Sequence, residues 1–179
     1  MQRMVTDIQK DILENELLNW EFLDEMAENI AKCNGINPLV ISSPEESKII
    51  KNSTPAVYVF RIVEGDPMVA LEMYKKFRDN HHALDSQIEK YNLTSITKDA
   101  SPNEVFYVGK VRSNLYLRML NHWQSNSART GSLHLRRWTE GKIRFEADIY
   151  QLPERFPLLA DVLENEFKLQ LTPTVGSRT

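Results

Sequence analysis

The sequence predicts an α+β protein with a small three-stranded sheet flanked by helices. Three short segments are rich in β-branched and aromatic residues, which favour strands: 56–63, 105–109 and 142–150. Segments around them carry apolar residues at helical spacing. Apolar residues make up 41% and charged residues 26% of the chain, a globular composition, and 179 residues suffice to bury a core without disulfides.

Residues 1–54 are predicted to form a helical N-terminal extension. Between residues 4 and 32, apolar side chains fall near the spacing of two amphipathic helices. Asn34-Gly35 is a stop signal, and Pro38 lies just beyond it. A further short helix is expected after Ser43, a residue type that favours the N-cap position.

The first predicted strand, 56–63, ends at the turn signal Gly65-Asp66-Pro67. A long helix is expected over 68–91, because its apolar residues recur with helical spacing. A proline-containing linker, 92–103, then leads to the second strand, 105–109.

The C-terminal half continues with a helix, a strand and a helix. Ser113 or Asn114 is expected to cap a helix with several apolar residues. A short helix over 133–138 is followed by the third strand, 142–150, whose residues alternate in polarity. A last helix is predicted to begin at Pro157.

Charge is distributed unevenly along the chain. The formal net charge is −3, but residues 105–179 hold 11 Lys+Arg and 7 Asp+Glu, a net of +4. Residues 1–104 hold 11 Lys+Arg and 18 Asp+Glu, a net of −7. A basic C-terminal part suits an active face that meets phosphates, although random surface variation explains the division equally well.

The sequence predicts a cytoplasmic protein without a membrane partner. No apolar run approaches the roughly 20 residues of a membrane span, and the N-terminus lacks the apolar core of a signal peptide. The single cysteine, Cys33, cannot form an intramolecular disulfide or a cysteine-rich zinc site.

Six polar side chains on the predicted elements are candidates for a site. Taken singly, each has an ordinary explanation: a strand tyrosine usually packs in a core, and charged residues on helices usually face solvent. The arginine and the histidine are four residues apart, however, so they share one helix face. The six are Tyr58, Tyr107, Lys110, Arg118, His122 and Glu164.

Together these residues resemble the GIY-YIG nuclease family. The family's first strand ends in Gly-Ile-Tyr, which corresponds to Ala56-Val57-Tyr58, and its second strand carries Tyr-Ile-Gly, here Tyr107-Val108-Gly109. The family's next helix reads Asn-Leu-x-x-Arg-x-x-x-His, and residues 114–122 read Asn-Leu-Tyr-Leu-Arg-Met-Leu-Asn-His. A later helix supplies one metal-binding glutamate, which the resemblance places at Glu164.

The resemblance covers residues 55–178 and implies a nuclease domain over 55–179 with a mainly antiparallel sheet. Ala56 replaces the family's first glycine. The two tyrosines are 49 residues apart, far more than the family's usual hairpin, so 66–103 is interpreted as a helical insertion. Gly176 stands where the family's closing Pro-x-x-Asn segment has asparagine, so the side-chain hydrogen bonds of that asparagine are missing at this position.

The resemblance implies one Mg²⁺ or Mn²⁺ per active site, bound by Glu164. One carboxylate with several waters and phosphate oxygens suits the oxygen preference of magnesium. Arg118 is a permanently charged, planar group that suits a phosphate clamp, and Lys110 would add a second positive charge.

The assignment of the general base is less direct. The resemblance implies Tyr58 as the base, with His122 relaying its proton and Tyr107 positioning the water or the phosphate. The residues alone equally allow the two tyrosines to exchange roles. His122 as the direct base is a further alternative, because its pKa is better matched to neutral pH.

Other polar residues are predicted at the margins of the site. His81 and His82 are adjacent in a helix and point about 100° apart, so they are interpreted as surface residues and not as a metal pair. His134 lies beside two arginines, in either a nucleic-acid contact or a solvated basic patch. The predicted nucleic-acid-binding residues are Arg112, Asn114, Arg136 and Arg137.

The leading functional hypothesis is a metal-dependent endonuclease that hydrolyses nucleic-acid phosphodiester bonds, with DNA as the expected partner. A homodimer would be needed if single-site subunits cut both strands. The alternative is a GIY-YIG-like module that has lost catalysis and binds nucleic acid or protein. A third hypothesis makes residues 1–54 a helical interaction module with the nuclease-like part as its scaffold.

Overall fold

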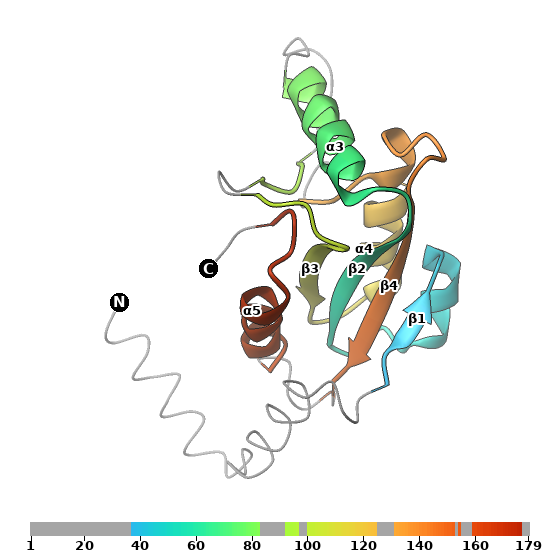
Figure 1. Ribbon diagram of the computed structural model, residues 1–179. Coiled ribbons are helices and arrows are strands. Elements are labelled where there is room, and N and C mark those ends of the chain that lie inside the picture. The colour runs from blue at the N-terminus through green and yellow to red at the C-terminus, as the bar shows by residue number, and fades with distance from the viewer. Residues whose placement is uncertain are drawn as a thin grey trace. The chain divides into compact units, whose positions relative to one another are not determined.

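A computed structural model of the chain shows a β-sheet with helices packed against it (Figure 1). The chain divides into two compact units, 1–37 and 38–179, and the fold below is that of the second unit. The helices predicted between residues 4 and 32, Cys33, and the predicted helix start at Pro157 lie outside the described residues. The structure describes residues 37–82, 92–96, 100–124, 131–152, 154 and 159–176.

A four-stranded antiparallel sheet forms the centre of the fold. Its strands lie in the order β1-β4-β2-β3, and each neighbouring pair is antiparallel. The α+β class predicted from the sequence is confirmed, while the expected number of three strands is wrong. The strands are β1 (Leu39–Ile41), β2 (Ala56–Glu64), β3 (Val105–Val111) and β4 (Arg144–Gln151).

The additional strand, β1, comes from the part of the chain that was expected to be helical. Its register places Leu39 opposite Ile149 and Ile41 opposite Ala147, so it extends the sheet along the free side of β4. A strand of three residues is too short to show an alternating pattern in the sequence. Pairing with β4 therefore determines its conformation.

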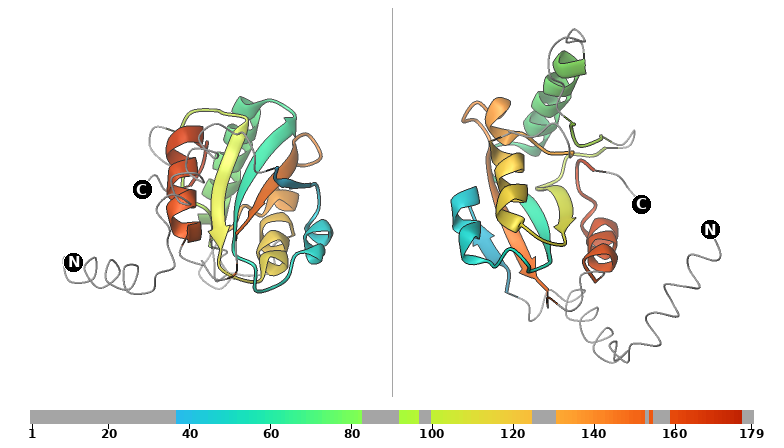
Figure 2. Two further views of the ribbon diagram at one scale, coloured as in Figure 1. Left: turned by 90° about the horizontal axis from the view of Figure 1, so that it is seen from below. Right: turned by 180° about the vertical axis from the view of Figure 1, so that it is seen from behind.

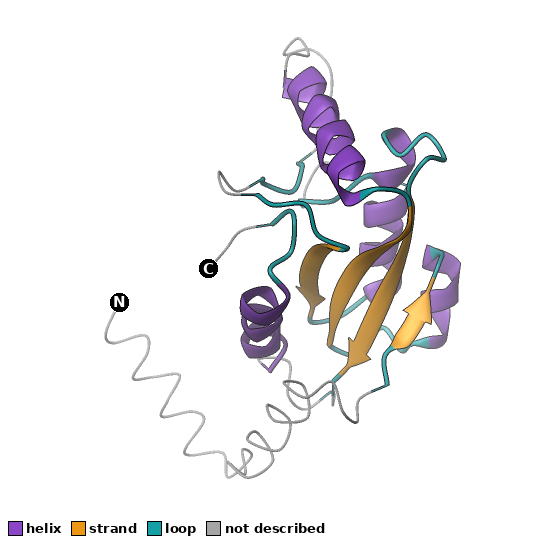
Figure 3. Ribbon diagram, in the orientation of Figure 1, coloured by secondary structure: helices purple, strands orange, loops and turns teal. Residues whose placement is uncertain are grey.

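Helices surround the sheet (Figure 3), and local side-chain caps fix where two of them begin. At the start of the predicted insertion helix, the Asp66 carboxylate accepts the backbone N–H of Met68 at 2.7 Å. Asn114 is the N-cap of the following helix and accepts the N–H of Leu117. The helices are η1 (Pro44–Ile49), α3 (Pro67–His82), α4 (Leu115–Trp123), η2 (Leu135–Arg137) and α5 (Leu159–Leu171).

The helices α4 and α5 lie on opposite faces of the sheet (Figure 2). Val57 is paired with Tyr150, so both point to one face, and the ring of Tyr150 lies 4.8 Å from that of Phe167 on α5. Phe60 points to the other face because side chains alternate along a strand. Its ring lies 5.1 Å from that of His122 on α4.

An aromatic core joins α3 and the segment around η2 to the end of the sheet. Tyr74 of α3 lies 5.7 Å from Phe106 and 5.2 Å from Trp138, measured between ring centroids. Phe106 in turn lies 5.1 Å from Phe145 of β4. Among the described residues, no helix is long and apolar enough to cross a membrane.

Candidate active site

The candidate site is built around Tyr58, on the central strand β2. Its side chain is fully buried, and its residue lies opposite Gly109 of the edge strand β3. A Cβ atom at residue 109 would lie 2.6 Å from the Tyr58 hydroxyl oxygen and 2.7 Å from Cε1 of Tyr107. The glycine thus provides the space in which the two tyrosine side chains meet.

Two side chains of α4 approach the Tyr58 hydroxyl, as their spacing of four residues predicts. The Nε–H of Arg118 donates to the hydroxyl oxygen at 2.7 Å. The Nε2 atom of His122 lies 3.1 Å from the same oxygen. The ring of Tyr107 lies 5.2 Å from that of His122 and 6.2 Å from that of Tyr58. The structure therefore brings these four predicted residues together.

Residues 131–133 hold the Arg118 guanidinium and the His122 imidazole in place. Arg118 donates from Nη2 to the Gly131 carbonyl at 2.9 Å and from Nη1 to the Ser132 hydroxyl at 3.3 Å. The backbone N–H of Leu133 donates to Nδ1 of His122 at 3.2 Å. Sequence reasoning missed this contribution, because backbone donors and acceptors have no residue signature.

Burial and charge shift the ionisation of the tyrosines and the histidine. Burial raises the pKa of the Tyr58 hydroxyl strongly, Tyr107 adds to this, and Arg118 opposes it. Burial also raises the pKa of Tyr107. Burial, followed by the charges of Arg118 and His134, lowers the pKa of His122 well below its usual value. The cluster is accordingly neutral at its tyrosines and its histidine, with one fixed positive charge on Arg118.

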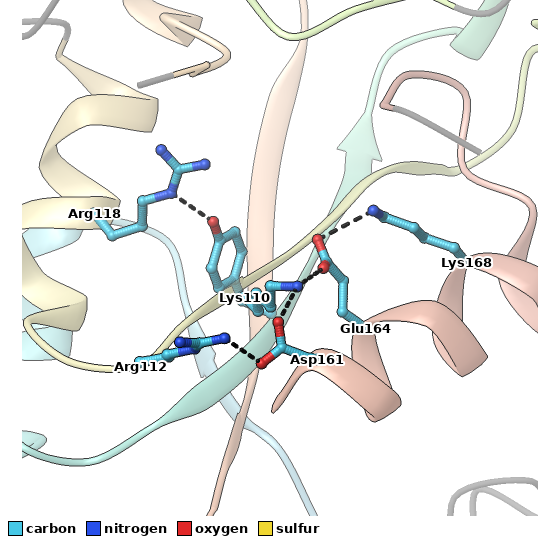
Figure 4. Close-up of polar contacts among 7 residues, drawn as sticks. Lys110, Arg112, Arg118, Asp161, Glu164 and Lys168 are labelled. Atoms are coloured by element: carbon cyan, nitrogen blue, oxygen red, sulfur yellow. Dashed lines mark hydrogen bonds and ion pairs between the residues drawn. The ribbon is translucent and has the colours of Figure 1, made fainter. Parts of the chain in front are cut away.

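A second cluster joins β3 to α5 (Figure 4). Lys110 Nζ lies 2.8 Å from Oε2 of Glu164 and 2.6 Å from Oδ1 of Asp161. Oε1 of Glu164 is bound by Lys168 at 3.1 Å, and Oδ2 of Asp161 by Arg112 at 3.0 Å. Asp161 and Lys168 were not predicted, although they lie three residues before and four after Glu164 and so share its helix face.

The donor atoms around Lys110 suit a small divalent cation. Carboxylate oxygens of Glu164 and Asp161 converge on the single ammonium of Lys110, which shows that both can reach one cation position. Magnesium is typically bound by one or two carboxylates together with waters and phosphate oxygens. Within the described residues, no group of three or more His, Cys, Asp or Glu side chains could hold a metal. The pair fits a magnesium ion that keeps several waters.

The two clusters meet at the edge strand β3. Figure 4 shows Arg118 approaching from α4 and Glu164 from α5, with Lys110 between them. The register gives the reason: Tyr58 lies across from Gly109, while Lys110, one residue further on, points to the α5 face. Burial is the largest cause of the raised pKa of Tyr58, and the negative charge of Glu164 makes a smaller contribution in the same direction, so the two clusters are electrostatically coupled.

Comparison of this chain with protein-family models, with curated proteins and with solved structures gave no match. The resemblance to the GIY-YIG family therefore remains a prediction.

The predicted nucleic-acid contacts lie on the surface at two places. The Arg112 side chain is 59% exposed and pairs with Asp161. Asn114 is exposed, but its side-chain oxygen is occupied in capping α4. Arg136 and Arg137 are both exposed on η2. Their role as nucleic-acid contacts stays a prediction.

Two histidines that were expected at the surface are buried. His81 is 4% exposed and stacks on Phe77, with 6.2 Å between the ring centroids. His134 is fully buried, so it does not share the exposed surface of the neighbouring arginines, and burial lowers its pKa to about 4. Both expectations failed because helix position alone does not show which face packs against the rest of the fold.

The C-terminal segment covers the outer edge of β3 beside Tyr107. The N–H of Val175 donates to the Phe106 carbonyl at 2.9 Å, and Val175 forms a parallel bridge with Tyr107. Gly176 has φ of +118°, a backbone conformation that favours glycine, and lies against the Tyr107 ring. The Asn103 side chain donates to the carbonyls of Leu171 and Thr172, which anchors this segment at the end of α5.

Proposed function

We propose that this protein is a metal-dependent endonuclease that hydrolyses phosphodiester bonds, with DNA as the substrate. The observation that carries the proposal is the Tyr58 hydroxyl held by Arg118 beside the Lys110–Glu164 ion pair. A potential base, permanent positive charges and a carboxylate are the three kinds of group that phosphodiester hydrolysis requires.

Tyr58 is the proposed general base for the attacking water. Burial keeps its hydroxyl neutral in the protein alone, because burial disfavours the phenolate. Arg118 opposes this effect, while the negative charge of Glu164 adds to it. Burial is the largest cause of the raised pKa, so a cation bound at Glu164 would lower the pKa of Tyr58 only by the smaller part that the charge of Glu164 contributes.

Positive groups at the same edge would bind the phosphate. Arg118 presents a planar guanidinium, and Lys110 a compact ammonium that is about one-third exposed. Loss of one such contact to the transition state typically costs about 100-fold in rate. A divalent metal held by Glu164, with Asp161 in reach, would stabilise the negative charge that develops on the phosphoryl oxygens.

A non-catalytic binding module is the second candidate, and one observation favours it. Both carboxylate oxygens of Glu164 are already bound by lysines, so the carboxylate has two positively charged partners without a metal. A module that only binds would retain this ion-pair network as structure. Catalysis is preferred because Arg118 and His122 both converge on the Tyr58 hydroxyl, which is more than the single partner that a buried hydroxyl needs.

The proposal is tested by incubating the purified protein with supercoiled plasmid in magnesium or manganese, beside Glu164→Ala. The matched control is Glu166→Ala, on the same helix, whose carboxylate accepts a hydrogen bond from the Gln170 side chain at 2.7 Å. Nicking or linearisation that is lost in the first variant and kept in the second supports the proposal. Cleavage that survives Glu164→Ala contradicts the assigned metal ligand. Absence of cleavage on both DNA and RNA substrates favours the binding module.

A further inference from the structure

The ring of His122 is fixed at both nitrogens. Its Nδ1 accepts the backbone N–H of Leu133 at 3.2 Å, and its Nε2 lies 3.1 Å from the hydroxyl oxygen of Tyr58. His122 and Leu133 are both fully buried, so neither is exposed to bulk solvent. Because a backbone N–H can only donate, Nδ1 must carry no proton.

The proton of the neutral ring is therefore on Nε2. A neutral imidazole has one N–H donor and one acceptor nitrogen, and the acceptor is already determined. Burial and the charge of Arg118 both disfavour the imidazolium form of His122. The Nε2–H thus points at the Tyr58 oxygen, which receives two hydrogen bonds, one from His122 and one from Arg118.

We propose that His122 is a permanent hydrogen-bond donor to Tyr58, a positioning residue that does not accept the proton of the tyrosine. The tautomer of His122 does not depend on the proposed function, but the effect of His122 on catalysis rests on it. This donor role differs from the relay that the family resemblance implies, in which His122 would take that proton. Tyr58 can act as a base only as the phenolate, so its own hydroxyl proton must first leave on the side of the substrate, away from His122. The phenolate then takes one proton from the attacking water, and that proton stays on the tyrosine oxygen while the leaving oxygen takes a proton from solvent.

A relay through His122 would require the surrounding backbone to rearrange. Nε2 can accept a proton only if it starts without one, so the neutral ring would have to carry its proton on Nδ1. That N–H would face the N–H of Leu133. Two buried donors facing each other is an arrangement that proteins avoid. Relieving it means moving 131–133, the same segment whose Gly131 carbonyl and Ser132 hydroxyl hold Arg118. The fold thereby ties the tautomer of His122 to the position of Arg118.

The tautomer can be measured without any activity. Long-range ¹H–¹⁵N correlation spectra of the full chain with ¹⁵N-labelled histidine distinguish the two neutral tautomers and the imidazolium form. The chain has four histidines, and the His122→Gln spectrum identifies the signals of His122 by their loss. We expect Nε2–H with bare Nδ1 from about pH 5.5 to about pH 8.5. An Nδ1–H tautomer, or an imidazolium in this range, overturns the proposal.

Cleavage assays with two variants then test whether catalysis requires a hydrogen-bond donor at residue 122. In His122→Gln, the side-chain amide can donate to Tyr58 but cannot take up a proton, so activity should stay within about tenfold of the native protein. In His122→Leu the donor is absent, and activity should fall by about 100-fold or more. Equal loss in both variants overturns the donor role. If the native protein cuts no substrate at all, the proposed function fails while the spectra still decide the tautomer.

Discussion

Gly109→Ala is the substitution whose effect follows most directly from the structure. The added Cβ would lie 2.6 Å from the Tyr58 hydroxyl oxygen, 2.7 Å from Tyr58 Cζ and 2.7 Å from Tyr107 Cε1. Ordinary contact begins at 3.4 Å, so the hydroxyl would have to move by about 0.8 Å. Arg118 and His122 hold that oxygen from α4, and the strand position of residue 109 is fixed by pairing with β2.

If the protein is the proposed nuclease, the expected result is a folded variant that cleaves more slowly. Overpacking of this kind typically costs about 1–3 kcal/mol of unfolding free energy. A displacement of the base by about 1 Å can cost on the order of 100-fold in rate. Plasmid cleavage under single-turnover conditions measures the rate, and urea denaturation measures stability.

The matched control for this substitution is Gly131→Ala. A Cβ at residue 131 would meet no atom closer than 4.0 Å, so this variant should be as stable as the native protein, or more so, and should cleave at a similar rate. If Gly109→Ala cleaved within threefold of the native rate and unfolded like the control, the close approach of Tyr58 to Gly109 would be refuted.

The remaining predictions concern charge. Burial lowers the pKa of His134 to about 4, so between pH 6.5 and 4 the unfolded chain takes up a proton that the folded chain does not. The free energy of unfolding should therefore fall by up to about 3 kcal/mol as the pH is lowered through this window. In urea titrations at a series of pH values, His134→Gln should make that fall smaller. Glu164→Gln removes the carboxylate that pairs with Lys168, whose side chain is only 9% exposed. We expect the free energy of unfolding to fall by about 3 kcal/mol, and adding Lys168→Met should recover part of this loss. If the effects of the two substitutions on stability were fully additive, the ion pair would be refuted. If Arg136 and Arg137 contact phosphates, their replacement by alanine should reduce the slope of log K against log salt by about 2 in DNA-binding titrations, and an unchanged slope would remove them from the interface.

The parts of the fold that the sequence predicted are those determined by local pattern. The strands β2, β3 and β4 have runs of β-branched and aromatic residues, and α4 has both its apolar spacing and an N-cap, Asn114. The strand β1 could not be predicted, because its three residues form a strand through pairing with β4. Burial of His81 and His134 likewise depends on what packs against them.

The candidate site, too, could be predicted only where a local sequence pattern reveals its residues. Arg118 and His122 were predicted to share a helix face, and both reach Tyr58. The carbonyl of Gly131 and the N–H of Leu133, which orient them, could not be predicted, since every non-proline residue offers these groups. Lys168 and Asp161 were detectable only through their spacing from Glu164, and that spacing is common on any charged helix.

The site lies at β3 because two successive residues of this strand, Gly109 and Lys110, face opposite sides of the sheet. Gly109 leaves space on the α4 face, where the Tyr58 hydroxyl can reach the sheet edge. Lys110, the next residue, must point to the other face, where α5 presents Glu164. One strand therefore brings a buried neutral hydroxyl and a partly buried ion-pair network within electrostatic range, although they lie on opposite faces of the sheet. Neutralising Glu164 on one face would shift the proton affinity of Tyr58 on the other, because the charge of Glu164 is among the causes of the raised pKa of Tyr58.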